Sequence, residues 1–471
     1  MPDDYKPVKL FAKQKAIYPK RVWGKYRKIK WIVMFVTLAI YYLAPWLRWD
    51  RGVGAPDQAI LIDLPNSRAY FFSIEIWPQE IYYLTGLLII AAVALFFVTS
   101  LFGRIWCGYA CPQTVWTDLF VWVERVFQGD RNARIKLDKS PLSFEKIWKK
   151  AATHFTWLFI GLCTGGAWVF YFNDAPTLAE HMLHFDVPWS VMVWVVSLTI
   201  STYIMAGFAR DQVCAFMCPY ARFQSAMFDK DSLIIGYDEE RGETRGSHKK
   251  GESWEGRGHC VDCTACVQVC PMGIDIRDGL QMECIACGFC IDACNNIMDK
   301  VGLPHGLVRY DTTNNQEARL AGKPEKSRIF RLRTFYYGGI LLVVGSLMLY
   351  SLMTRSPLDL SVLHDRNPLF VKMSDGKIRN GYEVKILNKT HDDRNYTLEI
   401  LDFPDAEIEI KGAGNLTFDN LPVLADSVGH FRVFIKAKAQ KKNRKEIMLK
   451  IQDKETLRVE TEKTIFVSKN K

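Results

Sequence analysis

Five long apolar stretches divide this chain, and polar segments separate them. A helix needs roughly 17 to 25 mostly apolar residues to cross a hydrocarbon core about 30 Å thick. The five stretches are residues 31–47, 81–102, 153–172, 189–208 and 334–353. Their lengths predict a five-helix transmembrane bundle. The residues before the first stretch are basic and lack a small-residue cleavage site, so we expect that stretch to remain as an anchor.

The charge of the loops predicts the orientation of these spans. Residues 1–30 carry ten Lys and Arg, whereas residues 51–80 carry two. Residues 103–150 are basic again, and residues 173–188 contain no Lys or Arg. Lys and Arg are enriched in cytoplasmic loops. We therefore expect the N-terminus and residues 209–333 to be cytoplasmic and the C-terminal segment to lie outside.

The C-terminal part has the period of β-strands. Apolar and polar side chains alternate in short runs across residues 369–471, for example at Tyr382, Val384 and Ile386. Successive side chains of a strand point to opposite faces, so this pattern predicts half-buried strands. Several such runs separated by turn residues are typical of a β-sandwich. We expect a docking or structural role for it.

The net charge of +10 raises the question of nucleic-acid binding. The Lys and Arg residues cluster beside the apolar stretches, where topology signals and anionic lipid account for them. We therefore expect membrane lipid as a partner and no nucleic acid.

Twelve of the 13 cysteines fall into four tight motifs, and Cys163 stands alone. Two of the motifs have the spacing of bacterial ferredoxins, in which three neighbouring cysteines bind one [4Fe-4S] cluster and the fourth reaches the other cluster. This spacing assigns Cys260, Cys263, Cys266 and Cys294 to one cluster, and Cys284, Cys287, Cys290 and Cys270 to the second. Zinc ribbons usually separate their cysteine pairs more widely, and disulfides are rare in the cytoplasm. We therefore expect two [4Fe-4S] clusters.

The other two motifs are CxxxCP sequences at the ends of the second and fourth spans. They contain Cys107 and Cys111 before Pro112, and Cys214 and Cys218 before Pro219. Proline is favoured as the first residue of a helix, which places the preceding cysteine at its N-cap, where a thiolate is stabilised. Four converging thiolates would bind a soft ion such as Cu(I), zinc or an iron-sulfur centre. The alternative is that these cysteines only pack at a helix end.

These patterns together predict a multi-domain membrane protein in five parts. The parts are a basic cytoplasmic arm at 1–30, a four-span membrane domain at 31–226, a cytoplasmic ferredoxin-like α+β domain at 227–333, a fifth transmembrane helix at 334–353 and an outer β-sandwich at 354–471.

The combination of basic arm, spans, CxxxCP pairs, double cluster motif and outer sandwich resembles the CcoG/FixG/RdxA family, the accessory proteins of cbb3-type cytochrome c oxidase. Related quinol-dehydrogenase subunits share the CxxxCP and cluster motifs, and the sandwich favours the former family. The resemblance implies a multi-pass protein of the bacterial inner membrane whose C-terminal all-β domain is an immunoglobulin-like sandwich in the periplasm. It also implies a role in oxidase assembly, with reduction of Cu(II) to Cu(I) as the activity and a copper transporter or assembly factor as partner.

Three functions follow as hypotheses. The first is a cupric reductase in which Cys107, Cys111, Cys214 and Cys218 hold copper as catalytic residues. The second is a quinol-oxidising conduit to an external partner, which needs a quinone pocket near the membrane face. The third is a non-enzymatic assembly scaffold. The sequence leaves the cytoplasmic electron donor and a homodimeric state open.

Overall fold

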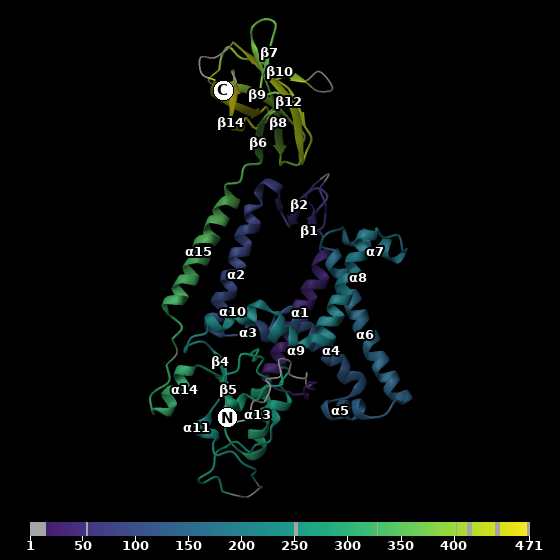
Figure 1. Cartoon of the computed structure of the whole chain (residues 1–471), viewed down its shortest axis with the longest axis vertical. Helices are drawn as coiled ribbons and strands as arrows, with labels where there is room; N and C mark the ends of the chain where they lie inside the picture. Colours follow the sequence, from purple (N-terminus) through teal and green to yellow (C-terminus); the bar gives the residue numbers. More distant parts are fainter. Residues whose placement is uncertain are drawn as a thin grey trace, which may run out of the picture. The chain divides into compact units, whose positions relative to one another are not determined.

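The computed structural model describes residues 16–52, 55–248, 253–326, 328–401, 403–411, 417–438 and 443–468. The chain forms two compact units. One comprises Met1–Leu47 and Gln58–Met348, and the other comprises Arg48–Asp57 and Leu349–Lys471. The first holds the apolar helices and all thirteen cysteines, and the second holds the β-sandwich (Figure 1).

Four helical segments of the described chain are long and apolar enough to cross a membrane. They are Lys25–Trp46, which begins with α1 (Lys25–Leu43), Pro78–Phe102 with α2 (Tyr82–Phe102), Trp189–Met217 with α8 (Trp189–Ile204), and Leu332–Met353, which is α15. In each apolar window no more than 22% of the residues are buried. Such exposed apolar faces fit a lipid environment. The protein is therefore a multi-pass membrane protein.

The predicted third span, residues 153–172, is not among these four. It lies in α6 (Phe144–Val169), a continuous helix of 26 residues. Its apolar part is diluted by His154, by three threonines and by three glycines. The structure thus supports four of the five predicted spans by length and hydropathy. α6 packs against α8 and α4 (Pro112–Gln128).

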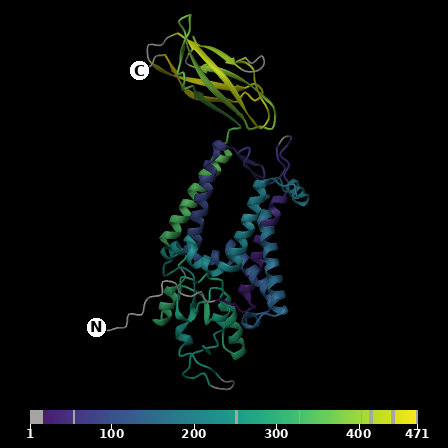
Figure 2. The same cartoon turned by 45° about the vertical axis from the view of Figure 1, so that its right-hand side comes forward.

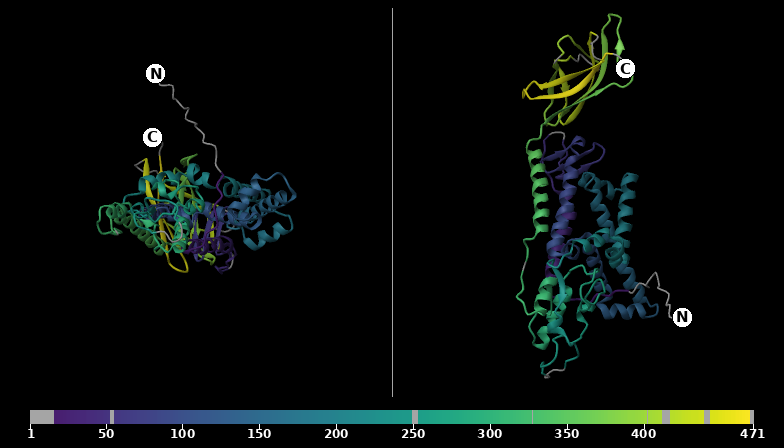
Figure 3. Two further views of the ribbon diagram at one scale, coloured as in Figure 1. Left: turned by 90° about the horizontal axis from the view of Figure 1, so that it is seen from below. Right: turned by 60° about the vertical axis from the view of Figure 1, so that its left-hand side comes forward.

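Helix α15 lies beside α2. Gly86 of α2 leaves room for the side chain of Met348, and the right-hand view of Figure 3 shows the two helices side by side. A Cβ at residue 86 would collide with the Met348 side chain. Small residues allow such close helix contacts in membranes, where no hydrophobic effect drives helices together.

Both CxxxCP motifs lie on short, irregular helical segments. The first follows α2 as α3 (Ile105–Tyr109), and Cys111 is the N-cap of α4 in an extended conformation, as Pro112 requires. The second lies after α8, in a run of a π-helix (Met205–Ala209), α9 (Arg210–Gln212) and a second π-helix (Val213–Met217), before α10 (Pro219–Met227). π-Helical turns are frequent at functional sites.

The ferredoxin-type region is a small α+β unit. Strands β4 (Ile234–Tyr237) and β5 (Val308–Asp311) pair antiparallel, and short helices hold the cysteine loops around them. The helices are α11 (Glu239–Gly242), α12 (Ala265–Gln268), α13 (Phe289–Val301) and α14 (Thr313–Leu320). Side chains from β4, β5 and α13 form its core. α13 contacts α1, so the region is joined to the membrane helices.

The sequence pattern did not predict three other elements. The loop after α1 folds into an antiparallel sheet of β1 (Ile60–Asp63), β2 (Arg68–Phe71) and β3 (Ile74–Ile76). α7 (Ala175–Leu183) lies between α6 and α8, and α5 (Arg131–Lys139) follows α4. None of them carries a cysteine.

The second unit is a sandwich of two antiparallel sheets, which Figure 2 shows face to face. One sheet has the order β10-β12-β8-β6, with β7 paired to β8, and the other has the order β11-β9-β13-β14. The strands are β6 (Leu358–His364), β7 (Val371–Lys372), β8 (Ile378–Asn388), β9 (Arg394–Leu401), β10 (Glu407–Lys411), β11 (Leu421–Val423), β12 (Ser427–Ala437), β13 (Arg444–Asp453) and β14 (Val459–Val467). Tyr382, Val384 and Ile386 are fully buried between the sheets, which confirms the predicted alternation.

Candidate iron-sulfur and thiol sites

The first set of ferredoxin-type cysteines surrounds a cavity. The cavity is small, about 20 Å³, is lined by Cys260, Cys263, Cys266 and Cys294, and its other walls are mostly apolar. The fourth of these, Cys294, comes from α13 and interacts electrostatically with the other three. The structure therefore brings together the four cysteines that the spacing assigned to one cluster. Cys263 is exposed, so this set lies near the protein surface. We call it the outer set.

The second set, Cys270, Cys284, Cys287 and Cys290, lies deeper. Cys290 interacts with the other three thiols, again in the predicted combination. Burial raises the pKa of Cys284 to about 11 and that of Cys270 to about 12. We call it the inner set, because it faces the membrane helices.

The chemistry of both sets fits iron-sulfur clusters. Backbone N–H groups donate to the sulfurs, from Met272 and Ile274 to Cys270, from Ala286 to Cys284 and from Val308 to Cys294. Such donors stabilise thiolates rather than thiols. None of the thirteen cysteines forms a disulfide. Burial keeps these thiols protonated, whereas the amide donors would stabilise them as thiolates. Both features fit a metal centre, because metal binding displaces the thiol protons.

Matching backbone conformations turn the two cysteine loops inward. Asp262 and Thr264, on either side of Cys263, have positive φ angles of 50° and 54°. Ala286 and Gly288, on either side of Cys287, have φ angles of 52° and 76°. Left-handed residues in such positions aim successive amides into one concavity, an arrangement that binds anions and iron-sulfur centres. The two loops thus repeat one local design.

The four CxxxCP cysteines also gather in one place. Cys214 interacts electrostatically with Cys111, Cys107 and Cys218, and all four are half-buried. Within the described residues, however, no three His, Cys, Asp or Glu side chains are arranged to hold a single metal ion. The thiols are therefore neighbours but do not form a ready-made ion site.

The first CxxxCP segment packs directly on the inner set. Gly108 touches the loop between Cys284 and Cys287 so closely that a Cβ there would lie 2.6 Å from the carbonyl oxygen of Ile285. The Tyr109 hydroxyl donates to the carbonyl oxygen of Cys287 at 3.1 Å. Cys107 packs in the same apolar cluster as Cys287. Backbone contact of this kind requires glycine.

The sequence analysis missed a group of charged residues at the inner end of α1. Arg27 and Lys30, interpreted there only as topology signals, are 4% and 2% exposed. Arg27 binds both carboxylate oxygens of Asp118 in α4, at 2.7 and 2.9 Å. The amides of Tyr26 and Arg27 donate to the carboxylate of Asp292 in α13. A carboxylate at a helix N-terminus satisfies its free amides and interacts well with its dipole.

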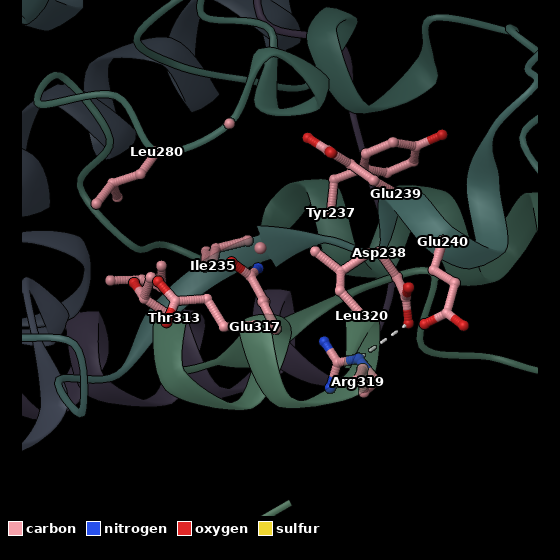
Figure 4. A pocket seen from close by; sticks show the side chains of 14 residues that line it. Ile235, Tyr237, Asp238, Glu239, Glu240, Leu280, Thr313, Glu317, Arg319 and Leu320 are labelled. Carbon is pink, nitrogen blue, oxygen red and sulfur yellow. Dashed lines mark ion pairs between the residues drawn. The ribbon is translucent and has the colours of Figure 1, made fainter. Parts of the chain in front are cut away.

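A separate pocket, with no cysteine in its lining, opens on the ferredoxin-type region (Figure 4). Its walls include Glu239, Glu240 and Glu317, together with an ion pair between Asp238 and Arg319. Tyr237 lines both this pocket and the cavity of the outer set.

The similarity to known proteins extends over nearly the whole chain. Family models match residues 209–313, described as a 4Fe-4S dicluster domain, residues 84–130, described as a 4Fe-4S binding domain, and residues 348–469, described as an IG-like fold at the C-terminal of FixG. The nitrogen fixation protein FixG of Rhizobium meliloti is 48% identical over 458 residues, which cover 90% of this chain and 87% of FixG. The chain belongs to the FixG/RdxA/RdxB family.

Two further FixG-family relatives come from Cereibacter sphaeroides. RdxB is 49% identical over 413 residues, covering 87% of each chain, and RdxA is 46% identical over 431 residues, covering 91% of this chain and 90% of RdxA. A crystal structure of a FixG-related protein from Vibrio parahaemolyticus covers 25% of this chain and 100% of its own, at 22% identity and a TM-score of 0.22, which is too low to carry an argument. The FixG-family protein described here is an iron-sulfur membrane protein with an IG-like C-terminal domain.

Proposed function

We propose that this FixG-family protein is an oxidoreductase that reduces Cu(II) to Cu(I) for the assembly of a cbb3-type cytochrome c oxidase. The contact of Gly108 and Tyr109 with the inner cysteine set is the observation that carries this proposal. It joins the segment that would bind copper to the segment that would hold a redox centre. Two [4Fe-4S] clusters, bound by the outer and inner sets, would supply single electrons there.

The CxxxCP cysteines would bind the arriving copper. Each Cu(II) takes up one electron to become Cu(I), and the sulfur ligands favour and retain the reduced ion. Cys111 would bind it from the N-cap of α4, at the positive end of the helix dipole. The remaining thiols would close around the ion by side-chain rotation, since they already lie close together. The Cu(I) product would pass to a copper transporter or an oxidase assembly factor.

The number of membrane spans and their orientation are also part of this proposal. We include α6 as a fifth span, because a 26-residue helix is about 39 Å long and it packs along α8. With five spans, the N-terminus and the ferredoxin-type region lie in the cytoplasm and the sandwich lies in the periplasm.

This topology makes a direct prediction. A reporter that is active only in the periplasm should be active when fused after Lys471 and silent when fused near Gly302, because the charge asymmetry holds across all five spans. Immunoblots of both fusions control for expression. The opposite pattern would move every cysteine motif to the other side of the membrane.

The copper reaction can be measured on the purified protein. Anaerobic protein is reduced with dithionite, desalted and mixed with Cu(II) and a Cu(I)-specific chelator. We expect about one Cu(I) per electron lost, for two one-electron clusters. The Cu(I) complex is measured by its own signal, and the iron-sulfur absorbance that dithionite bleached should recover as the clusters are oxidised. Protein boiled before desalting is the control. Oxidation of the clusters without formation of Cu(I), or no oxidation by Cu(II), would contradict the proposal.

A quinol-oxidising conduit is a second candidate, because the structure contains a cavity at the membrane face. The cavity is small, about 40 Å³, is lined by Lys30, Asp118, Gln113 and Cys214 and reaches Phe289 beside the inner set. Lys30 and Asp118 place one ionisable group of each charge in its wall. Replacing dithionite by a water-soluble quinol in the same assay separates the two functions, since only the conduit is reduced by the quinol.

A further inference from the structure

Helix α1 places a buried cation, Lys30, beside the inner cysteine set. Lys30 is 2% exposed, and its Nζ lies 4.9 Å from the centre of the Phe289 ring, two residues after Cys287. Lys30 lines the same small cavity as Ile285 and Phe289, which lie two residues before and two residues after Cys287. An ammonium group is costly to bury, so its position needs an explanation.

The two neighbouring carboxylates are shared among more cations than they can neutralise. Asp118 interacts with the charge of Lys30, and both its oxygens also accept from Arg27. Asp292 accepts from the amides at the N-terminus of α1. Arg104 adds a further positive charge near Cys284, whose backbone carbonyl oxygen it reaches at 3.4 Å. The side chains around the inner set therefore carry a net positive charge.

The outer set has the opposite balance. Its nearest cation is Arg277, which interacts with Cys266. Arg277 is bound by two carboxylates, at 2.5 Å by Asp275 and also by Asp262. Glu243 adds a third carboxylate, bonded to the hydroxyl of Tyr237 in the wall of the cavity, and Arg245 lies 3.6 Å from Glu243 as a second cation. Three carboxylates thus stand against two cations. The charges beside the outer set therefore have a net negative sign.

We infer that Lys30 raises the reduction potential of the cluster held by the inner set above that of the cluster held by the outer set. Reduction adds one negative charge to a cluster, and a nearby cation stabilises that charge, most strongly where water is excluded. The inference rests on the proposed assignment of one cluster to each set. Lys30 acts through the inner cluster and does not contact the copper, so it is a positioning residue. The reducing electron then resides next to the CxxxCP segment that would use it.

Redox titration of the intact protein tests the inference. Full-length protein in detergent is titrated anaerobically, and the reduced clusters are followed by electron paramagnetic resonance. Lys30→Met should lower the midpoint potential of the inner cluster and leave the outer one unchanged, while Lys30→Arg should restore the wild-type value. The matched control is Lys28→Met, which removes an exposed charge from the same helix. Cys263→Ala protein, which lacks an outer ligand, assigns the inner signal.

If the Lys30→Met protein loses its iron, its inner cluster cannot be titrated. A second variant then tests the same inference from the side of the outer cluster. Asp262→Asn removes a half-exposed carboxylate beside the outer set and keeps a side chain that tolerates the left-handed backbone at this position. We expect this change to raise the potential of the outer cluster towards that of the inner one. Equal shifts of both clusters, no shift in either variant, or an outer potential above the inner one in wild-type protein would overturn the inference. Wild-type protein without two clusters would instead refute the proposed function.

Discussion

Protein carrying both Cys111→Ala and Cys218→Ala should keep its iron and lose most of its Cu(II) reduction. The two cysteines come from the two CxxxCP motifs, which the fold brings together through Cys214. Removing a residue that only supports a metal ligand typically lowers metal affinity or activity roughly 10- to 100-fold. This variant loses two of the proposed ligands themselves. We therefore expect the rate of Cu(I) formation to fall at least as far. Iron analysis and the Cu(I)-trapping assay measure the two quantities on one preparation.

Cys163→Ala is the matched control for this variant. Cys163 lies in α6, exposed and outside every motif, so its loss removes a thiol without changing the proposed site. Protein with this change should reduce copper at the wild-type rate. If the double variant also does so, the CxxxCP thiols take no part, and the quinol conduit or the scaffold becomes the better hypothesis.

The crossing of the fourth cysteine between the two ferredoxin motifs makes the second large prediction. Wild-type protein should contain about eight irons, from two four-iron clusters. Cys270→Ala removes a residue of the first motif, yet the structure places Cys270 among the cysteines of the second. Its paramagnetic spectrum should therefore match that of Cys287→Ala and differ from that of Cys263→Ala.

Cys294→Ala is the reciprocal case. Cys294 belongs to the second motif and interacts with Cys260, Cys263 and Cys266. Its spectrum should match that of Cys263→Ala, and each of the four variants should lose about four irons. Spectra that group by motif instead, Cys270 with Cys263 and Cys294 with Cys287, would show that each motif binds its own cluster. Stoichiometric zinc without iron in anaerobic protein would exclude clusters altogether.

The residues that the sequence placed correctly are those whose partners lie at fixed short spacings. The alternation at Tyr382, Val384 and Ile386 predicts a buried sandwich face, and each of the three side chains is fully buried. The proline after Cys111 predicts a helix start, and α4 begins at Pro112. In both cases local geometry alone determines the outcome.

The residues whose surroundings the sequence did not show have partners far away in the chain. Lys30 and Arg27 belong to the basic segment before the first span, which indicates topology. No neighbouring residue in the sequence shows that Arg27 will bind Asp118 or that Lys30 will pack on Phe289. α6 is long enough to span a bilayer, but its polar and small residues reduce its hydropathy below that of the other four helices. Side-chain spacing encodes neither tertiary burial nor the environment that a helix finds.

The cap on α1 has a consequence in time. The amide of Arg27 and the carboxylate of Asp292 are separated by 265 residues. At the usual rate of synthesis, about 5 to 20 residues per second, α1 leaves the ribosome roughly 13 to 50 s before its cap exists. During that interval its first amides can bond only to water or lipid head groups. The N-terminus of α1 therefore reaches its final structure only when α13 of the cysteine-rich insert has been synthesised and has folded against it.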